Sequence, residues 1–315
     1  MIQVLSDALI PVFACLLLGY LAGQRKVVDN KDVRSLITFV MSFALPCSLF
    51  LTIARTRRDL LAGQGMLACA VAIVFAIVYA ASYFCSRKLS QDLSGDAAVL
   101  SLTLSFPNIA AIGLPLLQAV YGVKAGNIAA IGIATGAMTI SPVTLAILES
   151  GTSAGQALTL ATRVRNSMWR AVTRPVVWAP MLGILAALIK FNMPSYLDRS
   201  LTVMGAATAG AALFLTGLIV SAQRFALNAR VVWAVLLKNF LQPALFLGVA
   251  TLVGVPRDVT HAAVLMCAIP CGFFGLVFGK GFNVSPPTAS PSLIASYVLG
   301  IFTLAGWIVL LSRLG

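Results

Sequence analysis

The fold of this chain depends on the stretch Phe106-Pro107-Asn108-Ile109-Ala110-Ala111-Ile112-Gly113-Leu114-Pro115, which lies inside a long apolar segment. Proline in a helix interior removes a hydrogen bond and collides with the preceding turn. In hydrocarbon, each freed backbone group is costly unless protein or water satisfies it. We therefore expect the helix to unwind here, near the middle of a membrane. A new half-helix should begin at about Pro115, because proline suits a first helical turn.

A second break of the same kind lies at Ala268-Ile269-Pro270-Cys271-Gly272-Phe273. The exposed amides at the start of a half-helix carry roughly half a positive charge, so they can hold an anion without a lysine. Two such ends facing each other suit a carboxylate, or a small dicarboxylate that bridges them. Asn108 is the best side-chain candidate, because its amide can donate to a carboxylate. The alternatives are two kinked packing helices and an Asn108 that only caps freed backbone.

The composition of the chain requires lipid as its solvent. Of the 315 residues, 60% are hydrophobic and only 10% are charged, and the mean hydropathy is +0.98. A soluble domain has about 25% charged residues. The formal net charge of +13 would suggest nucleic-acid binding in a soluble protein. Here the basic residues lie between apolar runs and serve membrane orientation, so we expect membrane lipid as a partner and no nucleic acid.

Charges divide the chain into ten apolar segments, one of them broken only by Lys238. Most segments reach the roughly 17–25 residues that span hydrocarbon. The first segment is expected to be a membrane helix rather than a signal peptide, because it lacks a basic start and carries Asp7. The sequence therefore predicts an all-α membrane protein of ten transmembrane helices, over residues 8–24, 35–54, 60–86, 97–123, 125–148, 175–189, 200–223, 231–256, 259–279 and 281–312.

These segments form two halves. Residues 1–148 and residues 175–315 each give five helices, joined by a cytoplasmic connecting loop at 149–174. An odd number of helices per half gives the two halves opposite orientations, which is the inverted-repeat plan of many transporters. Odd-numbered loops hold 13 Lys and Arg, against 8 on the other side. The positive-inside rule then predicts a multi-pass protein of the inner membrane with both termini outside.

A few other polar residues are candidates for function. Lys238 lies within an apolar segment, where a lysine is costly and is a functional hypothesis by default. It could attract substrate, replace a coupling cation, or extend to the cytoplasmic interface. If transport is coupled to Na⁺ or a proton, hydroxyl and carbonyl groups near Ser141 or Ser296 are candidate ligands. We expect no resident cofactor and no metal, because His261 is the one histidine and cannot build a typical site alone.

The first break resembles a motif of the auxin efflux carrier family. Asn108-x-Ala110-x-x-Gly113-x-Pro115-Leu116 stands where that family has Asn-x-Gly-x-x-Gly-x-Pro-Leu. Within the family, the chain is most similar to the bacterial malonate-transporter-like branch. Ala110 for glycine and Ala111 for a bulky residue put an indole-sized substrate in doubt and leave carboxylates open. Further stretches fit the family in order along nearly the whole chain: Ala44-Leu45-Pro46 with Leu49-Phe50, Leu213-Phe214 with Gly217, Lys238 with Pro243, and Ala268 with Pro270.

The resemblance implies the inverted-repeat fold shared with bile-acid and sodium/proton carriers, in which helices four and nine cross at their broken centres. Helices one, two, six and seven would form a scaffold, and helices three to five and eight to ten an elevator-like transport domain. We expect a homodimer through the scaffold helices. The expected function is secondary transport of a small mono- or dicarboxylate such as malonate, not enzymatic catalysis. Alternatives are export of a larger acidic metabolite or amino acid, and a membrane sensor that binds the same anion.

The candidate residues fall into three sets. The residues at the helix breaks are Pro107, Pro115 and Pro270. The candidates for ion coupling are Ser141 and Ser296. The candidates for substrate contact are Asn108, Ala110, Gly113, Pro115, Pro270, Cys271, Gly272, Ser48 and Lys238.

Overall fold

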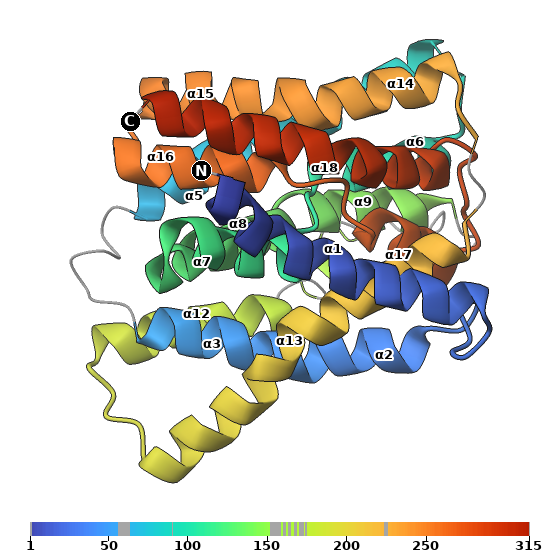
Figure 1. Cartoon of the computed structure of the whole chain (residues 1–315). Coiled ribbons are helices and arrows are strands. Elements are labelled where there is room, and N and C mark those ends of the chain that lie inside the picture. The colour runs from blue at the N-terminus through green and yellow to red at the C-terminus, as the bar shows by residue number, and fades with distance from the viewer. Residues whose placement is uncertain are drawn as a thin grey trace.

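The computed structural model describes residues 2–55, 64–89, 91–151, 159, 162, 165–166, 169, 173, 175–223 and 226–314. Over these residues the chain is helical and contains no β-strand, as Figure 1 shows. The one β-type pairing within these described residues is an isolated antiparallel bridge between Pro107 and Cys271. The expected all-α class is confirmed for the described part of the chain.

Several helices are long and apolar enough to cross a membrane. Six stretches qualify by length and composition: Arg34–Ala54, Gln64–Lys88, Val123–Ser150, Ser195–Ser221, Ala229–Val253 and Ala289–Leu314. Three shorter apolar helices accompany them: Leu9–Gln24, Ile109–Tyr121 and Pro175–Leu188. The expected fourth and ninth segments do not qualify as continuous spans, because each is split into half-helices too short to cross hydrocarbon alone.

One group of helices, here called the panel, packs together through close backbone contact. A Cβ atom at Gly19 would lie 2.0 Å from the carbonyl oxygen of Phe214, and one at Gly217 would lie 1.9 Å from that of Leu16. Only glycine permits this approach of two membrane helices. Most of the panel lies in the lower part of Figure 1. It comprises α1 (Ile2–Gln24), α2 (Arg34–Phe39), the π-helical turn η1 (Val40–Ala44), α3 (Leu45–Ala54), α12 (Pro175–Leu188) and α13 (Ser195–Ser221).

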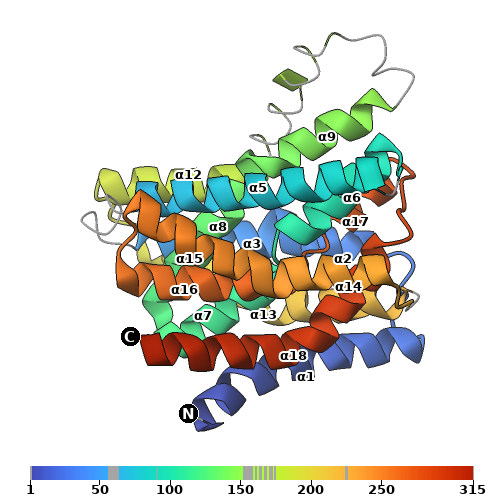
Figure 2. The same cartoon turned by 90° about the horizontal axis from the view of Figure 1, so that it is seen from above.

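The remaining helices form a second group, here called the core. Within it α5 packs on α6 and α15, α15 packs on α16, and α17 packs on α6. Figure 2 shows α5, α15 and α16 running side by side. The core comprises α5 (Gln64–Leu89), α6 (Ser94–Ser105), η2 (Ile109–Gly113), α7 (Leu114–Tyr121), η3 (Val123–Ala125), α8 (Gly126–Met138), α9 (Ile140–Ser150), α14 (Ala229–Leu236), η4 (Leu237–Leu241), α15 (Gln242–Val253), α16 (Arg257–Ala268), α17 (Phe274–Gly281) and α18 (Ala289–Leu314).

One of the expected spans is interrupted in the structure. The helix expected over residues 125–148 is interrupted at Thr139, between α8 and α9. Pro142 explains this interruption, because it has no N–H to donate to the carbonyl of Met138 one turn earlier. The expected connecting loop at 149–174 lies largely outside the described residues.

The panel meets the core where α13 lies against η2, where α1 lies against α7, and where α3 and α12 lie against α8.

Candidate functional site

The two interrupted helices cross inside the protein at their breaks. Regular helix ends at Ser105, and the next residue, Phe106, is extended, with φ −101° and ψ 100°. Pro107 then forms the antiparallel bridge with Cys271 of the second break. The backbone N–H of Asn108 donates to the Pro270 carbonyl at 3.0 Å. Both prolines thus lie at a crossing of extended backbone, and the groups freed by unwinding satisfy one another.

Gly272 makes this crossing possible. A Cβ atom there would lie 2.2 Å from the carbonyl oxygen of Phe106, and the Gly272 amide donates to the Thr103 carbonyl at 3.2 Å. The two backbones are therefore in direct contact with no room for a side chain. The close contact of the two backbones is therefore a sufficient reason for glycine at position 272, without any contact to substrate.

The α14–η4–α15 segment braces the ends of both broken helices. Gln242 Nε2 donates to the Ser105 carbonyl at 2.8 Å, at the last residue of α6. Lys238 Nζ donates to the Cys267 carbonyl at 2.6 Å, near the end of α16. A cation at a helix C-terminus is favoured by the helix dipole. Lys238 is fully buried, so the extension of its ammonium group to the cytoplasmic interface, one of the three expectations, is wrong.

Ser296 holds the second break in place. The Cys271 amide donates to Ser296 Oγ at 3.1 Å, and Ser296 Oγ donates to Asn239 Oδ1 at 2.7 Å. Asn239 Nδ2 in turn donates to the Ser296 carbonyl at 3.1 Å and to Thr303 Oγ1 at 3.2 Å. The Ser296 hydroxyl therefore already has a donor and an acceptor. Ser141, the other candidate for ion coupling, instead lines a separate cavity described below.

Asn108 is the polar side chain of the first break, and it reaches across to the panel. Its Nδ2 donates to Thr216 Oγ1 of α13 at 3.0 Å and also to the Tyr297 hydroxyl of α18. Among the residues that the structure describes, its Oδ1 has no hydrogen-bond partner, although the side chain is fully buried. Asn108 thus joins the two helix groups and keeps one acceptor vacant.

The helical turn after the first break begins earlier than expected. The π-helical turn η2 starts at Ile109, directly after Asn108, and α7 continues it from Leu114 with Pro115 in its first turn. Amides of a first turn have no partner earlier in the same helix, and Ala110 and Ala111 lie in this first turn, directly after Asn108. Pro115 has no N–H and lies inside a continuous helix, so the expectation that a half-helix begins there is corrected. Gly113 packs between Ile109 and Ile269.

Two cavities lie between panel and core, and they differ in chemistry. A cavity of about 410 Å³ on the side of the even-numbered loops is lined by polar and basic residues that include Ser48, Arg55, Gln118, Lys124 and Asn127. A cavity of about 140 Å³ on the other side is mostly apolar and is lined by residues that include Phe106, Ser141, Phe273, Phe274 and Phe278. Ser48 therefore lines the first, polar cavity and not the second, apolar cavity. Asn108 lines neither cavity.

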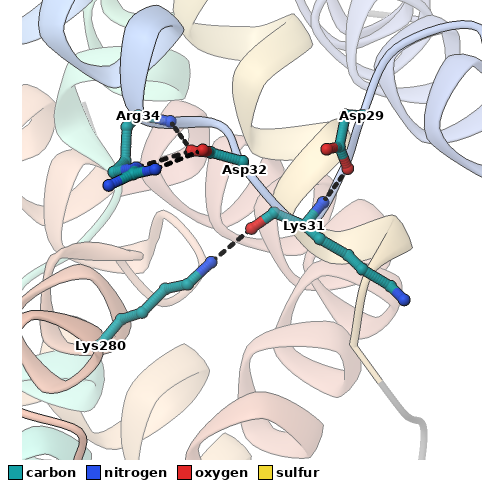
Figure 3. Close-up of polar contacts among 5 residues, drawn as sticks. All are labelled: Asp29, Lys31, Asp32, Arg34 and Lys280. Atoms are coloured by element: carbon teal, nitrogen blue, oxygen red, sulfur yellow. Dashed lines mark hydrogen bonds and ion pairs between the residues drawn. The ribbon is translucent and has the colours of Figure 1, made fainter.

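A second polar contact between panel and core lies at the face of the odd-numbered loops (Figure 3). Lys280, near the end of α17, donates from Nζ to the carbonyl of Lys31 in the α1–α2 connection. In the same connection, Arg34 donates to the Asp32 carboxylate from Nε at 2.8 Å and from its guanidinium NH₂ at 2.6 Å. These hydrogen bonds hold the pKa of Asp32 below its usual range, with a further contribution from Lys280. This contact joins the groups near the membrane surface.

The structure brings together only part of the predicted set. Asn108, Ala110, Pro270, Cys271 and Gly272 lie at or beside the crossing. Residues not singled out from the sequence also support it: Thr216, Asn239, Gln242 and Tyr297. The sequence does carry a signal for these four residues, because each is a polar side chain inside an otherwise apolar segment. Their pairing could not be foreseen, because each partner comes from a different helix.

Long apolar helices, two of them interrupted and crossed within the protein, are typical of secondary transporters. Fold and crossing therefore define a multi-pass membrane protein of the transporter class. The family described as "Membrane transport protein" matches the chain over residues 4–308, and the chain belongs to this family. The expected relationship to auxin efflux carriers is confirmed, and the protein is a membrane transporter rather than an enzyme.

Two relatives cover nearly the whole chain, and a third covers less than half of it. A protein named uncharacterized transporter YfdV from Escherichia coli (strain K12) is 30% identical over 311 residues, which is 97% of each chain. Auxin efflux carrier component 8 from Arabidopsis thaliana is 22% identical over 354 aligned positions, covering 97% of this chain and 96% of that protein. Auxin efflux carrier component 7 from the same plant is 28% identical over 152 residues, 45% of this chain and 25% of its own length.

Proposed function

We propose that this protein moves a small organic anion, a mono- or dicarboxylate such as malonate, across the inner membrane by elevator-type alternating access. One observation carries the proposal: Asn108 is buried at the crossing of two broken helices and is bonded across the boundary between panel and core. An intramembrane polar group of this kind indicates a substrate pathway. The plant relatives named as auxin efflux carriers support an organic acid as substrate.

In this proposal, the chain comprises ten helices in two inverted repeats, residues 1–148 and 175–315, with the panel as scaffold and the core as transport domain. Glycine contacts join α1 to α13 within the panel and the two breaks within the core. Each group is thus suited to move as a body. Asn108 lines neither the polar cavity nor the apolar cavity, although Phe106 and Phe273 of the two breaks line the apolar one. Sliding the core along the panel would expose Asn108 to one cavity and then to the other.

The polar cavity between panel and core supports an anionic substrate. Arg55 and Lys124 place positive charge at its wall, beside Gln118 and Asn127. Arg55 is partly neutralised by Asp198 at 2.7 Å, which leaves Lys124 as the freer cation. Positive charge in a cleft raises the local concentration of anions. The small side chains of Ala110 and Ala111 would let a carboxylate approach the first-turn amides closely.

Lys238 fits the role of a built-in cation. Its ammonium group neutralises the negative end of α16 from within the core, where a coupling Na⁺ or proton would otherwise be needed. We further propose that both termini lie outside, and that a homodimer forms through the panel. Neither proposal affects the chemistry at the crossing.

Transport in liposomes tests the function. Purified protein is reconstituted, vesicles are preloaded with unlabelled malonate, and uptake of labelled malonate is measured against empty vesicles, with and without Na⁺ and at two pH values. A carrier gives saturable uptake that internal substrate stimulates. A channel or a sensor gives no such stimulation, and this result would reject the proposed mechanism.

A further inference from the structure

The hydrogen bonds around Asn108 define which way its amide faces. Thr216 Oγ1 donates its single proton to the Ala212 carbonyl at 2.8 Å, so it can only accept from Asn108. The amide nitrogen therefore faces Thr216, at 3.0 Å, and the oxygen faces away from it. The neighbouring Tyr297 hydroxyl contacts the same nitrogen. The panel thus sets the orientation of the one polar side chain in the first break.

This orientation leaves a vacant acceptor at the crossing. Asn108 Oδ1 has no hydrogen-bond partner in the described part of the chain, and the side chain is fully buried. A buried acceptor left unpaired is costly. An ionised carboxylate offers only acceptors, so it can bond to the amide nitrogen and to the first-turn amides of η2 but cannot satisfy Oδ1. A ligand with its own O–H or N–H donor can satisfy both ends of the amide.

We propose that the transported acid carries a hydrogen-bond donor next to its carboxylate, and that Asn108 Oδ1 selects for this donor. The chemical class is a short hydroxy acid or a singly protonated dicarboxylate such as hydrogen malonate. This inference rests on the proposed function and narrows its substrate class. Thr216 acts as a positioning residue, because it orients the amide from the panel without being the selecting group.

Competition between two acids that differ by one hydroxyl tests the selection. Unlabelled lactate and unlabelled propionate are compared as inhibitors of labelled malonate uptake into liposomes containing the wild-type protein. Both acids have the same carbon chain and the same charge. Because only lactate can donate to Oδ1, it should inhibit at a concentration lower by on the order of tenfold.

Variants of Thr216 test the origin of the preference. In Thr216→Val the side-chain amide of Asn108 loses the partner that orients it and can turn. The ratio of the inhibitory concentration of propionate to that of lactate should therefore fall toward one. Thr216→Ser keeps the hydroxyl and should keep the ratio. Thr208→Val is the matched control, because Thr208 is also buried on α13, roughly 12 Å from Thr216 along the helix.

The outcomes separate the two proposals. Equal inhibition by lactate and propionate, with malonate uptake still saturable, overturns the donor selection and leaves the carrier in place. A preference that survives in Thr216→Val also overturns it, because the orientation would then not come from the panel. Absence of saturable uptake of malonate rejects the proposed function and this inference with it.

Discussion

The two helix breaks look alike in sequence but differ in what they leave free. The first break, at residues 106–108, ends in Asn108, whose Oδ1 is vacant and whose nitrogen bonds to the opposite helix group. The second break, at residues 269–273, offers no charged or amide side chain. Its Cys271 amide donates to Ser296 and its Gly272 amide donates to Thr103. The first break thus keeps one side-chain acceptor without a partner among the described residues, whereas the second break presents no such side chain.

This difference shows that a helix break in a membrane is not by itself a binding site. Freed backbone groups must be satisfied, and at the second break Ser296, Lys238 and the opposing backbone do so. The symmetric anion site expected from the sequence, with two helix ends sharing one carboxylate, is therefore replaced by an asymmetric proposal. In it Asn108 and the first turn of η2 contact the substrate.

The largest effect is expected from Gly272→Ala, which attacks the crossing itself. The added methyl group would lie 2.2 Å from a backbone oxygen that cannot move without breaking the bridge. We expect a loss of stability of at least about 3 kcal/mol, the upper range for overpacking, seen as loss of monodisperse protein after extraction. Gly248→Ala is the control, because a Cβ there meets no atom within 4 Å. Normal yield of Gly272→Ala would show that the two backbones are not in contact.

A smaller effect is expected from Lys238→Met, which removes one brace of the second break. The Cys267 carbonyl would lose its donor in a buried site, which costs about 1–3 kcal/mol in thermal unfolding. Since the ammonium group faces this carbonyl and lines neither cavity between panel and core, the KM for malonate should stay within about twofold of wild type. Lys88→Met, at an exposed site on α5, is the matched control. A large rise in KM at unchanged stability would instead make Lys238 a substrate contact.

Much of the fold could be predicted from the sequence, because the length of an apolar segment and the position of a proline determine the structure of that same segment. The break at Pro107, the break at Pro270 and the all-helical class follow from such local rules. The start of helix after the first break was misplaced at Pro115, because a π-helical turn beginning at Ile109 has no distinctive sequence signal. The roles of Thr216 and Ser296 depend on which helices become neighbours, and this information is not local. The position of Ser48 in the polar cavity also depends on which helices become neighbours.

The asymmetry between the breaks is tested most directly by comparing Asn108→Ala with Cys271→Ala in the liposome assay. Both side chains are fully buried at the crossing, and Cys271 Sγ makes one long contact, at 3.9 Å to the Ser292 carbonyl. We predict that Asn108→Ala lowers exchange-stimulated malonate uptake by on the order of tenfold or more, because a bond to a charged ligand is lost. Cys271→Ala should keep uptake within about twofold. Normal uptake in Asn108→Ala, or an equal loss in Cys271→Ala with both proteins monodisperse, would contradict the account.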